Sequence, residues 1–283
     1  MNIKLENVNF IYSPNTVEEI TALENINLTF NEDSFNAIIG STGSGKSTLI
    51  QLLNGLLKPT SGKVLYNGKE IFTGEKETKE QKRALRDLRC KVGIVFQYPE
   101  YQLFEETILK DVMFGPKNKG LNEKEAKEAA IKALLDVKIN ESMFEKSPFD
   151  LSGGEKRRVA IAGVLAMNPE VLILDEPTAG LDPAGKIEIL DLIKEYKEKN
   201  KVTIILVSHS MEEVASYAGR VIAMKRGKII LDGNTHEVFS KQEELVSLGL
   251  DIPECLKFSM SLGIEGGITV TEAAKMIAKK YKK

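Results

Sequence analysis

A glycine-rich segment near residue 40 contains the residue types needed to hold a phosphate chain. Gly40 to Ser47 reads GSTGSGKS, which matches G-x-x-x-x-G-K-[ST] and lies between an apolar run and a stretch with helical spacing. Glycines let such a loop bend around a phosphate with several N–H groups pointing inward, and the following helix adds its positive end. The predicted nucleotide-binding residues here are Gly40, Ser41, Thr42, Gly43, Ser44, Gly45, Lys46, Ser47 and Thr48.

Two of these side chains have specific predicted contacts. Lys46 would contact the β- and γ-phosphates of ATP, and the Ser47 hydroxyl would coordinate Mg²⁺. An ordinary glycine turn beside a surface lysine is the alternative interpretation. The strand-loop-helix context favours the phosphate site.

A pair of acids follows an apolar run later in the chain. Asp175 and Glu176 come directly after Val171 to Leu174, where a parallel sheet presents ligands beyond its carboxyl edge. Asp175 suits Mg²⁺, which prefers oxygen ligands, and Glu176 is placed to activate water in line with a γ-phosphate. An acidic strand end before proline is also often a helix cap, but the glycine loop upstream favours the catalytic interpretation.

The hydrophobic pattern predicts the elements that must position these residues. Residues 3–30 alternate like antiparallel strands, with Val8, Phe10 and Tyr12 on one face. The apolar runs after the middle of the chain alternate with helical stretches, as in a mostly parallel sheet covered on both faces. These runs are 171–174, 202–207 and 221–224.

Two other regions differ from this strand pattern. Residues 97–151 are predicted to form an inserted helical subdomain, in which Ala126, Ala130, Leu134 and Val137 share one apolar face. The charge-rich segment 73–89 is expected to face solvent as a helix or loop. We therefore expect one main domain over residues 1–240 and a small helical extension over 241–283.

Composition excludes several classes of protein. With a net charge of −2 the chain lacks the basic excess that drives nucleic-acid binding, so no nucleic-acid partner is expected. Its two cysteines, Cys90 and Cys255, lack the spacing of a zinc or redox site and are expected to be buried, reduced thiols. No apolar window is long enough to span a membrane, and Lys4 and Glu6 interrupt the first apolar run, which predicts a cytosolic protein.

Three further segments complete an ordered set of motifs. Leu151 to Glu155 reads LSGGE just before a helical stretch, Asp182 follows the acid pair, and His209 ends the next apolar run. Together with the glycine loop and the acids, this set resembles the ABC ATPase family over about residues 1–235. The resemblance implies an α/β P-loop NTPase fold with a mostly parallel sheet, an antiparallel β subdomain, an inserted helical subdomain and a small C-terminal helical extension.

The resemblance also implies a head-to-tail dimer in which the glycine loop of one chain and the LSGGE segment of the other enclose one ATP. Ser152, Gly153 and Gly154, at a helix N-terminus, would contact the γ-phosphate held by the partner chain. Ser152 and Glu155 also fit a capping box, and both interpretations can hold together. The family more often has glutamine at position 155. Asp182 corresponds to the loop that contacts the dimer partner.

Further catalytic roles come from the same resemblance. Gln97, at the end of an apolar run, looks like the glutamine that contacts Mg²⁺ and links the site to the helical subdomain. His209 resembles the switch histidine that orients the γ-phosphate and the water, so it joins Glu176 and Gln97 in the predicted catalytic set. Tyr12 is similar to the aromatic residue that stacks on adenine, although its alternation with neighbouring apolar residues suits core packing equally.

A finer resemblance rests on the segment after Gln97. Residues 96–107, FQYPEYQLFEET, and the tail past residue 240 look like the ATPases of energy-coupling-factor (ECF) importers, specifically the second of two paralogous subunits. Such ATPases carry a groove where helices of a transmembrane coupling protein dock. The predicted contact residues are Tyr98, Tyr101, Leu103 and Phe104.

The resemblance implies an assembly that energises uptake of vitamins or other micronutrients. It would contain this chain, a paralogous ATPase or a second copy of this chain, the transmembrane coupling protein and a membrane substrate-binding protein. The chain would then be peripheral, at the cytoplasmic face of the membrane, and residues 241–283 would contribute to dimerisation.

Three alternatives stay open at this level. A homodimeric ATPase of a dedicated cobalt or nickel importer uses nearly the same motifs. A soluble ABC ATPase of DNA repair or translation would have a long coiled-coil insertion or two cassettes, and neither is visible in the sequence. A small-molecule kinase would share the glycine loop but would have no use for LSGGE.

Overall fold

The computed structural model describes residues 1–72 and 78–281, and its strands form two sheets. Among these residues, one sheet has four antiparallel strands in the order β2-β1-β4-β5, and the other has six strands in the order β10-β9-β3-β8-β7-β6. The strands are β1 (Ile3–Tyr12), β2 (Ile20–Phe30), β3 (Phe35–Gly40), β4 (Ser61–Tyr66), β5 (Lys69–Glu70), β6 (Val92–Val95), β7 (Val171–Asp175), β8 (Thr203–Val207), β9 (Arg220–Lys225) and β10 (Lys228–Asn234).

Helices connect these strands and form the outer layers. They include three short 3₁₀ turns, η1 (Pro99–Gln102), η2 (Glu141–Met143) and η3 (Pro148–Asp150). The α-helices are α1 (Lys46–Leu53), α2 (Lys79–Lys91), α3 (Ile108–Lys119), α4 (Glu123–Asp136), α5 (Gly153–Leu165), α6 (Pro183–Asn200), α7 (Met211–Tyr217), α8 (Thr235–Ser240), α9 (Gln242–Ser247), α10 (Glu254–Ser261) and α11 (Val270–Tyr281).

The six-stranded sheet is parallel except at one edge, where β10 pairs with β9 in the antiparallel sense. All six residues of β3 and all five of β8 are buried, as expected for strands with both faces covered. Alternate side chains enter different cores. Ile38 packs toward the antiparallel sheet, whereas Ala37 and Ile39 pack toward the helices on the other side. The predicted α/β class is therefore confirmed.

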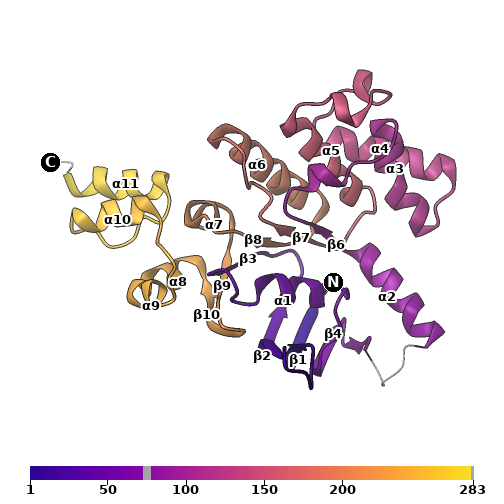
Figure 1. Ribbon diagram of the computed structural model, residues 1–283. Coiled ribbons are helices and arrows are strands. Elements are labelled where there is room, and N and C mark those ends of the chain that lie inside the picture. The colour runs from indigo at the N-terminus through magenta and orange to yellow at the C-terminus, as the bar shows by residue number, and fades with distance from the viewer. Residues whose placement is uncertain (73–77, 282–283) are drawn as a thin grey trace.

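The two cores lie on opposite sides of this sheet (Figure 1). The antiparallel sheet and α1 cover one side, and α3 to α7 cover the other. The predicted antiparallel pairing of residues 3–30 is correct, because Ile3 pairs with Phe30 and Tyr12 pairs with Ile20. Within β1, Val8 and Phe10 are buried while Tyr12 is 40% exposed, so the shared face runs from the core to the surface.

Helices α3, α4 and α5 pack together as a helical unit at one end of the molecule (Figure 1). The predicted apolar face of α4 is correct, because Ala126, Ala130, Leu134 and Val137 are all fully buried. Asn122 begins this helix with a capping box to Glu125. How the chain divides into domains, and where the helical subdomain ends, stays a prediction.

The charge-rich segment behaves in part as expected. Residues 73–77 lie outside the described residues, and α2 follows them as an exposed helix that begins with a capping box at Thr78. Leu85 and Leu88, however, are buried against the core beside α1. The run of charges concealed this two-residue apolar stripe, which sets how α2 lies on the domain.

Helices α8 to α11 follow β10. Helix α8 packs against β9 and β10, whereas α10 and α11 lie farther from the sheets (Figure 1). Helices α10 and α11 pack on each other, and Lys280 donates to the carbonyls of Leu262 and Gly263. Cys90 and Cys255 are free and partly buried, so the expected reduced thiols are less buried than predicted. No helix in the described part of the chain is long and apolar enough to cross a membrane.

We predict that Leu134→Ala lowers the free energy of unfolding by about 2–5 kcal/mol, because it leaves a cavity in the helical unit. Leu135→Ala is the matched control, since Leu135 is 46% exposed whereas Leu134 is fully buried. Urea denaturation of both variants measures the difference. Equal unfolding midpoints for the two variants would contradict this packing.

Candidate functional site

The glycine loop joins β3 to α1, as its sequence context predicted. Gly45 begins the helix with a left-handed backbone, φ 101°. A β-carbon there would lie 2.7 Å from the carbonyl oxygen of Ala22, so only glycine fits. Ser41, Thr42 and Gly43 are exposed, which leaves the outer part of the loop accessible to a nucleotide.

A second glycine fixes this loop to the antiparallel sheet. Gly227, in the turn between β9 and β10, donates its N–H to the carbonyl of Ser44 at 2.9 Å and accepts from the N–H of Glu24 at 2.8 Å. The loop is therefore tied to two different sheets. The sequence analysis did not identify this role, because it depends on contacts of Gly227 with residues far away in sequence.

Lys46 is 6% exposed, and its Nζ donates to the carbonyls of Gly40 at 2.7 Å and Ser41 at 3.1 Å. Burial lowers the pKa of Lys46, and the nearby carboxylates of Glu176 and Asp175 oppose that effect. Burial and the charge of Glu176 raise the pKa of Asp175, against the influence of Lys46 and His209. The predicted lysine and acids thus lie close enough to interact electrostatically.

Glu176 contacts the other two predicted catalytic residues, Gln97 and His209. Its Oε2 accepts a hydrogen bond from Gln97 Nε2 at 3.1 Å, and its Oε1 lies 2.9 Å from His209 Nε2. These residues follow β6, β7 and β8, which are neighbours in the sheet. Their position beyond the carboxyl ends of adjacent parallel strands explains how segments far apart in sequence meet.

The backbone at Glu176 has an unusual conformation. Its φ is 49°, in the left-handed region that few residues other than glycine occupy. Its N–H donates to the carbonyl of Val207 at 2.9 Å, and its own carbonyl accepts from Ala179 at 3.1 Å. Such a conformation costs of order 1–3 kcal/mol and persists only where the surroundings hold it.

The residues predicted to hold Mg²⁺ supply suitable ligand atoms. Ser47, Gln97 and Asp175 offer a hydroxyl, an amide and a carboxylate oxygen, the hard donors that Mg²⁺ prefers. Among the described residues, no group of three or more His, Cys, Asp or Glu side chains is arranged to hold a metal ion alone. A cation here would share its coordination between few protein atoms and the phosphates.

Tyr12 lies beside the start of α1. Its hydroxyl shares a hydrogen bond of 3.1 Å with Thr48, and its ring meets that of Phe10 edge to face at 4.8 Å. The ring is 40% exposed. This position next to the glycine loop suits adenine stacking, and that role stays a prediction.

The LSGGE segment forms the N-terminus of α5. The Ser152 hydroxyl donates to Glu155 Oε2 at 2.6 Å within a complete capping box, and this hydrogen bond lowers the pKa of Glu155. Ser152 and Gly153 are exposed, and apart from the adjoining residues and helix backbone no atom of the described residues would lie within 4 Å of a β-carbon at Gly153 or Gly154. Asp182 is also exposed and caps α6 through Gly185 at 3.0 Å.

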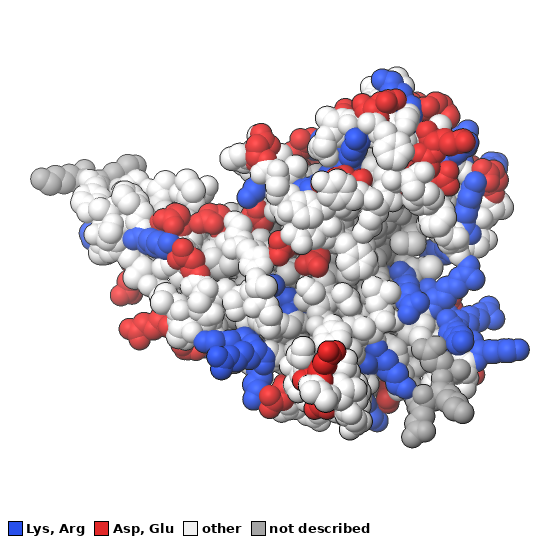
Figure 2. All heavy atoms as spheres, in the orientation of Figure 1, with Lys and Arg blue, Asp and Glu red and all other residues white. Residues whose placement is uncertain are grey.

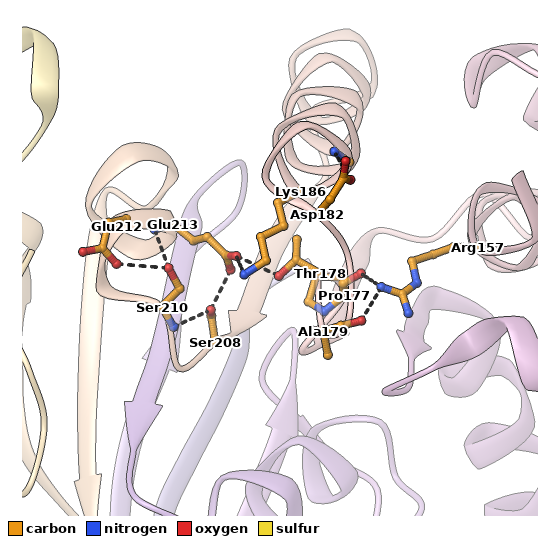
Figure 3. Close-up of polar contacts among 11 residues, drawn as sticks. Arg157, Pro177, Thr178, Ala179, Asp182, Lys186, Ser208, Ser210, Glu212 and Glu213 are labelled. Carbon is orange, nitrogen blue, oxygen red and sulfur yellow. Dashed lines mark hydrogen bonds and ion pairs between the residues drawn. The ribbon is translucent and has the colours of Figure 1, made fainter. Parts of the chain in front are cut away.

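Arg157 is a buried residue that the motif analysis missed. It forms a two-point ion pair with Glu100, at 2.6 and 3.0 Å, and donates to the carbonyls of Pro177 and Ala179. Figure 3 shows this guanidinium reaching the segment that follows Glu176. Helical spacing could have revealed it, because Arg157 lies four residues before the buried Ile161.

Glu213 is a second buried charge that was missed. It lies in α7 and accepts hydrogen bonds from Thr178 and Ser208 (Figure 3). The sequence signal was weak, an acid directly before the apolar pair Val214 and Ala215. Both missed residues contact the short segment 177–179, from opposite sides.

A groove of about 460 Å³ lies beside η1 and α3. Phe104 and Phe114 form one wall of this groove. Their rings meet edge to face with centroids 5.0 Å apart, and the two residues are 56% and 46% exposed, respectively. Leu103 also lines it but is 7% exposed, so it contributes to the floor and not to an exposed rim. Tyr101 is 84% exposed and Tyr98 40%, near this groove in sequence but outside its lining.

Basic side chains gather over α2, beside the same groove (Figure 2). Arg86 and Arg89 line the groove, and Lys79, Lys82 and Arg83 are exposed on the same helix. The groove therefore combines an aromatic wall with a positive rim.

Comparison with known proteins identifies the family. The chain matches the ABC transporter family over residues 23–179. It is 54% identical over 266 residues to the energy-coupling factor transporter ATP-binding protein EcfA2 of Caldanaerobacter subterraneus, covering 94% of this chain and 91% of that protein. The chain belongs to the ABC transporter ATPase family. The predicted resemblance to energy-coupling-factor ATPases is confirmed by this relative.

Other ABC ATPases give the same result. The protein of the same name from Clostridium perfringens is 54% identical over 255 residues, covering 90% of this chain and 87% of that protein. The structure of cbiO1 from Clostridium perfringens, part of the ABC transporter complex cbiONQ, superposes with a TM-score of 0.74 at 42% identity, covering 87% of this chain and 94% of that one. A dimeric ATP-binding cassette, MJ0796, bound to ADP and Pi, has a TM-score of 0.70 at 32% identity. The match covers 82% of this chain and 98% of that one.

We predict that Lys46→Ala weakens ATP binding by about 10- to 100-fold, because charge-assisted hydrogen bonds to the phosphates are lost. Titration with a fluorescent ATP analogue measures the affinity. Lys194→Ala, at an exposed position of α6, is the control and should bind as the wild type does. Wild-type affinity in a folded Lys46→Ala protein would argue against the glycine-loop assignment.

Proposed function

We propose that this chain is the ATP-binding and ATP-hydrolysing subunit of an energy-coupling-factor importer, and that Glu176, Gln97 and His209 form its hydrolytic centre. The single observation that carries the catalytic assignment is the contact of Glu176 with both Gln97 and His209 at the carboxyl edge of the sheet. Relatives at 54% identity that are named as energy-coupling factor ATP-binding proteins support the wider assignment.

In this proposal the glycine loop binds the phosphates and the acids act on water. The loop amides donate hydrogen bonds to the β- and γ-phosphates, Lys46 neutralises part of their charge, and Tyr12 stacks on the adenine. Mg²⁺, held by Ser47, Gln97 and Asp175, would neutralise charge that develops on the phosphate oxygens. Glu176 accepts a proton from the attacking water, and His209 orients that water and the γ-phosphate.

We propose that ATP is enclosed between two chains. Ser152, Gly153 and Gly154 present a hydroxyl and backbone amides at a helix N-terminus, a suitable seat for the γ-phosphate bound by the partner chain. The exposure of Ser152, Gly153 and Asp182 supports a contact with another molecule. The related MJ0796 cassette is itself dimeric in its ADP- and Pi-bound structure.

The groove beside η1 is the proposed docking site for the transmembrane coupling protein. Exposed aromatic side chains next to a positive rim suit an amphipathic segment with an apolar face and acidic or polar ends. Phe104 and Leu103 lie within the groove, while Tyr98 and Tyr101 extend the contact beyond it. Docking at this groove would hold the chain at the cytoplasmic face of the membrane as a peripheral subunit.

The remaining partners follow from the same proposal. A paralogous ATPase completes the dimer, residues 241–283 contribute to it, and a membrane substrate-binding protein supplies the vitamin or other micronutrient. A homodimeric ATPase of a dedicated cobalt or nickel importer is the second candidate, because it uses nearly the same motifs. Identifying the proteins that co-purify with the tagged chain from native membranes separates the two.

We predict that Glu176→Gln keeps ATP affinity but lowers the rate of hydrolysis by about 100-fold or more, because the proton acceptor is lost. Phosphate release by the assembled transporter and titration with a fluorescent ATP analogue measure the two quantities. Wild-type turnover in this variant would remove Glu176 from the mechanism.

We predict that Phe104→Glu reduces the amount of membrane protein that co-purifies with the chain, because a charge enters the aromatic wall. Leu135→Glu, an exposed apolar position on α4, is the control. Both variants should hydrolyse ATP at the rate of the isolated wild-type chain. Equal recovery of membrane partners with both variants would refute the docking site.

A further inference from the structure

Glu213 is a buried acid with three polar partners. It is 7% exposed, and its Oε1 accepts from the Thr178 hydroxyl at 2.8 Å while its Oε2 accepts from the Ser208 hydroxyl at 2.7 Å. Lys186 Nζ lies 3.9 Å from Oε1. Burying a carboxylate is costly unless it is paired and hydrogen-bonded, so these contacts are required for this residue to occupy its place.

The two hydroxyl partners lie next to the proposed catalytic residues. Ser208 immediately precedes His209, and Thr178 is two residues after Glu176. Both hydroxyl-bearing residues are themselves buried, at 3% and 4% exposure. One carboxylate therefore joins the segment that carries His209 to the segment that carries Glu176 (Figure 3).

The segment after Glu176 forms hydrogen bonds with charged side chains on both of its sides. Arg157 of α5 holds the carbonyls of Pro177 and Ala179, and Glu213 of α7 holds the side chain of Thr178 between them (Figure 3). Glu176 has a left-handed backbone, which the surroundings must stabilise. Glu213 is thus one of two charged groups that hold a strained residue in place.

We propose that Glu213 is a positioning residue for ATP hydrolysis, which sets the relative position of Glu176 and His209 through Thr178 and Ser208. The inference rests on the proposed roles of Glu176 and His209. The phosphate loop lies on β3 and α1, and Glu213 makes its hydrogen bonds to other segments. Loss of Glu213 should therefore disturb the chemical step and leave nucleotide binding intact.

The test compares Glu213→Ala and Glu213→Gln with Glu212→Gln in the assembled transporter. Glu212 is the neighbouring acid on α7, but it is exposed and contacts neither Thr178 nor Ser208. Phosphate release gives kcat and KM, a fluorescent ATP analogue gives nucleotide affinity, and thermal denaturation reports the folded state. Glu176→Gln is measured alongside as the reference.

Glu213→Ala is expected to lower kcat by about 10- to 100-fold, with nucleotide affinity and KM changed by less than about twofold, as for a small displacement of catalytic groups. Glu213→Gln should retain more activity, because an amide can accept from one hydroxyl and donate to the other. Glu212→Gln should match the wild type.

Several results would overturn the proposal. Wild-type kcat in folded Glu213→Ala, an equal loss in Glu212→Gln, or a fall in nucleotide affinity that matches the fall in kcat would each do so. If Glu213→Ala does not fold, the double variant Thr178→Val with Ser208→Ala carries the same expectation. An inactive Glu176→Gln beside a fully active Glu213→Ala refutes this inference alone, whereas an active Glu176→Gln refutes the proposed catalytic role.

Discussion

The register of three neighbouring parallel strands is the constraint on which the site depends. Val95 of β6 lies beside Leu174 of β7, and Asp175 lies beside Val207 of β8. This alignment brings the residues that follow each strand to one edge, where Glu176 touches both of its partners. A shift of one residue would reverse which side chains face each core, so apolar burial on both faces fixes the alignment.

Apolar packing fixes the strands, but polar contacts fix the site itself. Glu176 has a strained backbone. Burial raises the pKa of Asp175 and lowers the pKa of Lys46, and both shifts favour the neutral form of the side chain. None of these features favours folding, so other contacts must offset them. Arg157 and Glu213 provide such contacts next to Glu176. Each of these buried charged groups forms hydrogen bonds to the segment that follows Glu176, and these bonds also hold that segment in place.

The difference between local and long-range contacts explains what the sequence could predict. The glycine loop, the acid pair and the face of α4 each depend on residues close in sequence, and their patterns indicated the structure. The contact of Glu213 with Thr178 joins residues 35 positions apart, and the role of Gly227 depends on two other elements. Such contacts leave no periodic signal. The stripe of Leu85 and Leu88 was concealed because charges surround it.

The pairing of Arg157 with Glu100 connects η1, beside the groove, to the segment that follows Glu176 in the proposed hydrolytic centre. Glu100 lies in η1 beside the proposed docking groove. Its partner Arg157 also donates hydrogen bonds to the carbonyls of Pro177 and Ala179, just after Glu176. Breaking a buried ion pair of this kind costs about 3–5 kcal/mol, because one charge is left without a partner. Displacing η1 alone would incur that cost, whereas moving η1 together with α5 would not. In the proposed complex, a docked helix would therefore shift α5, with the LSGGE segment at its start, more readily than it would separate η1 from α5.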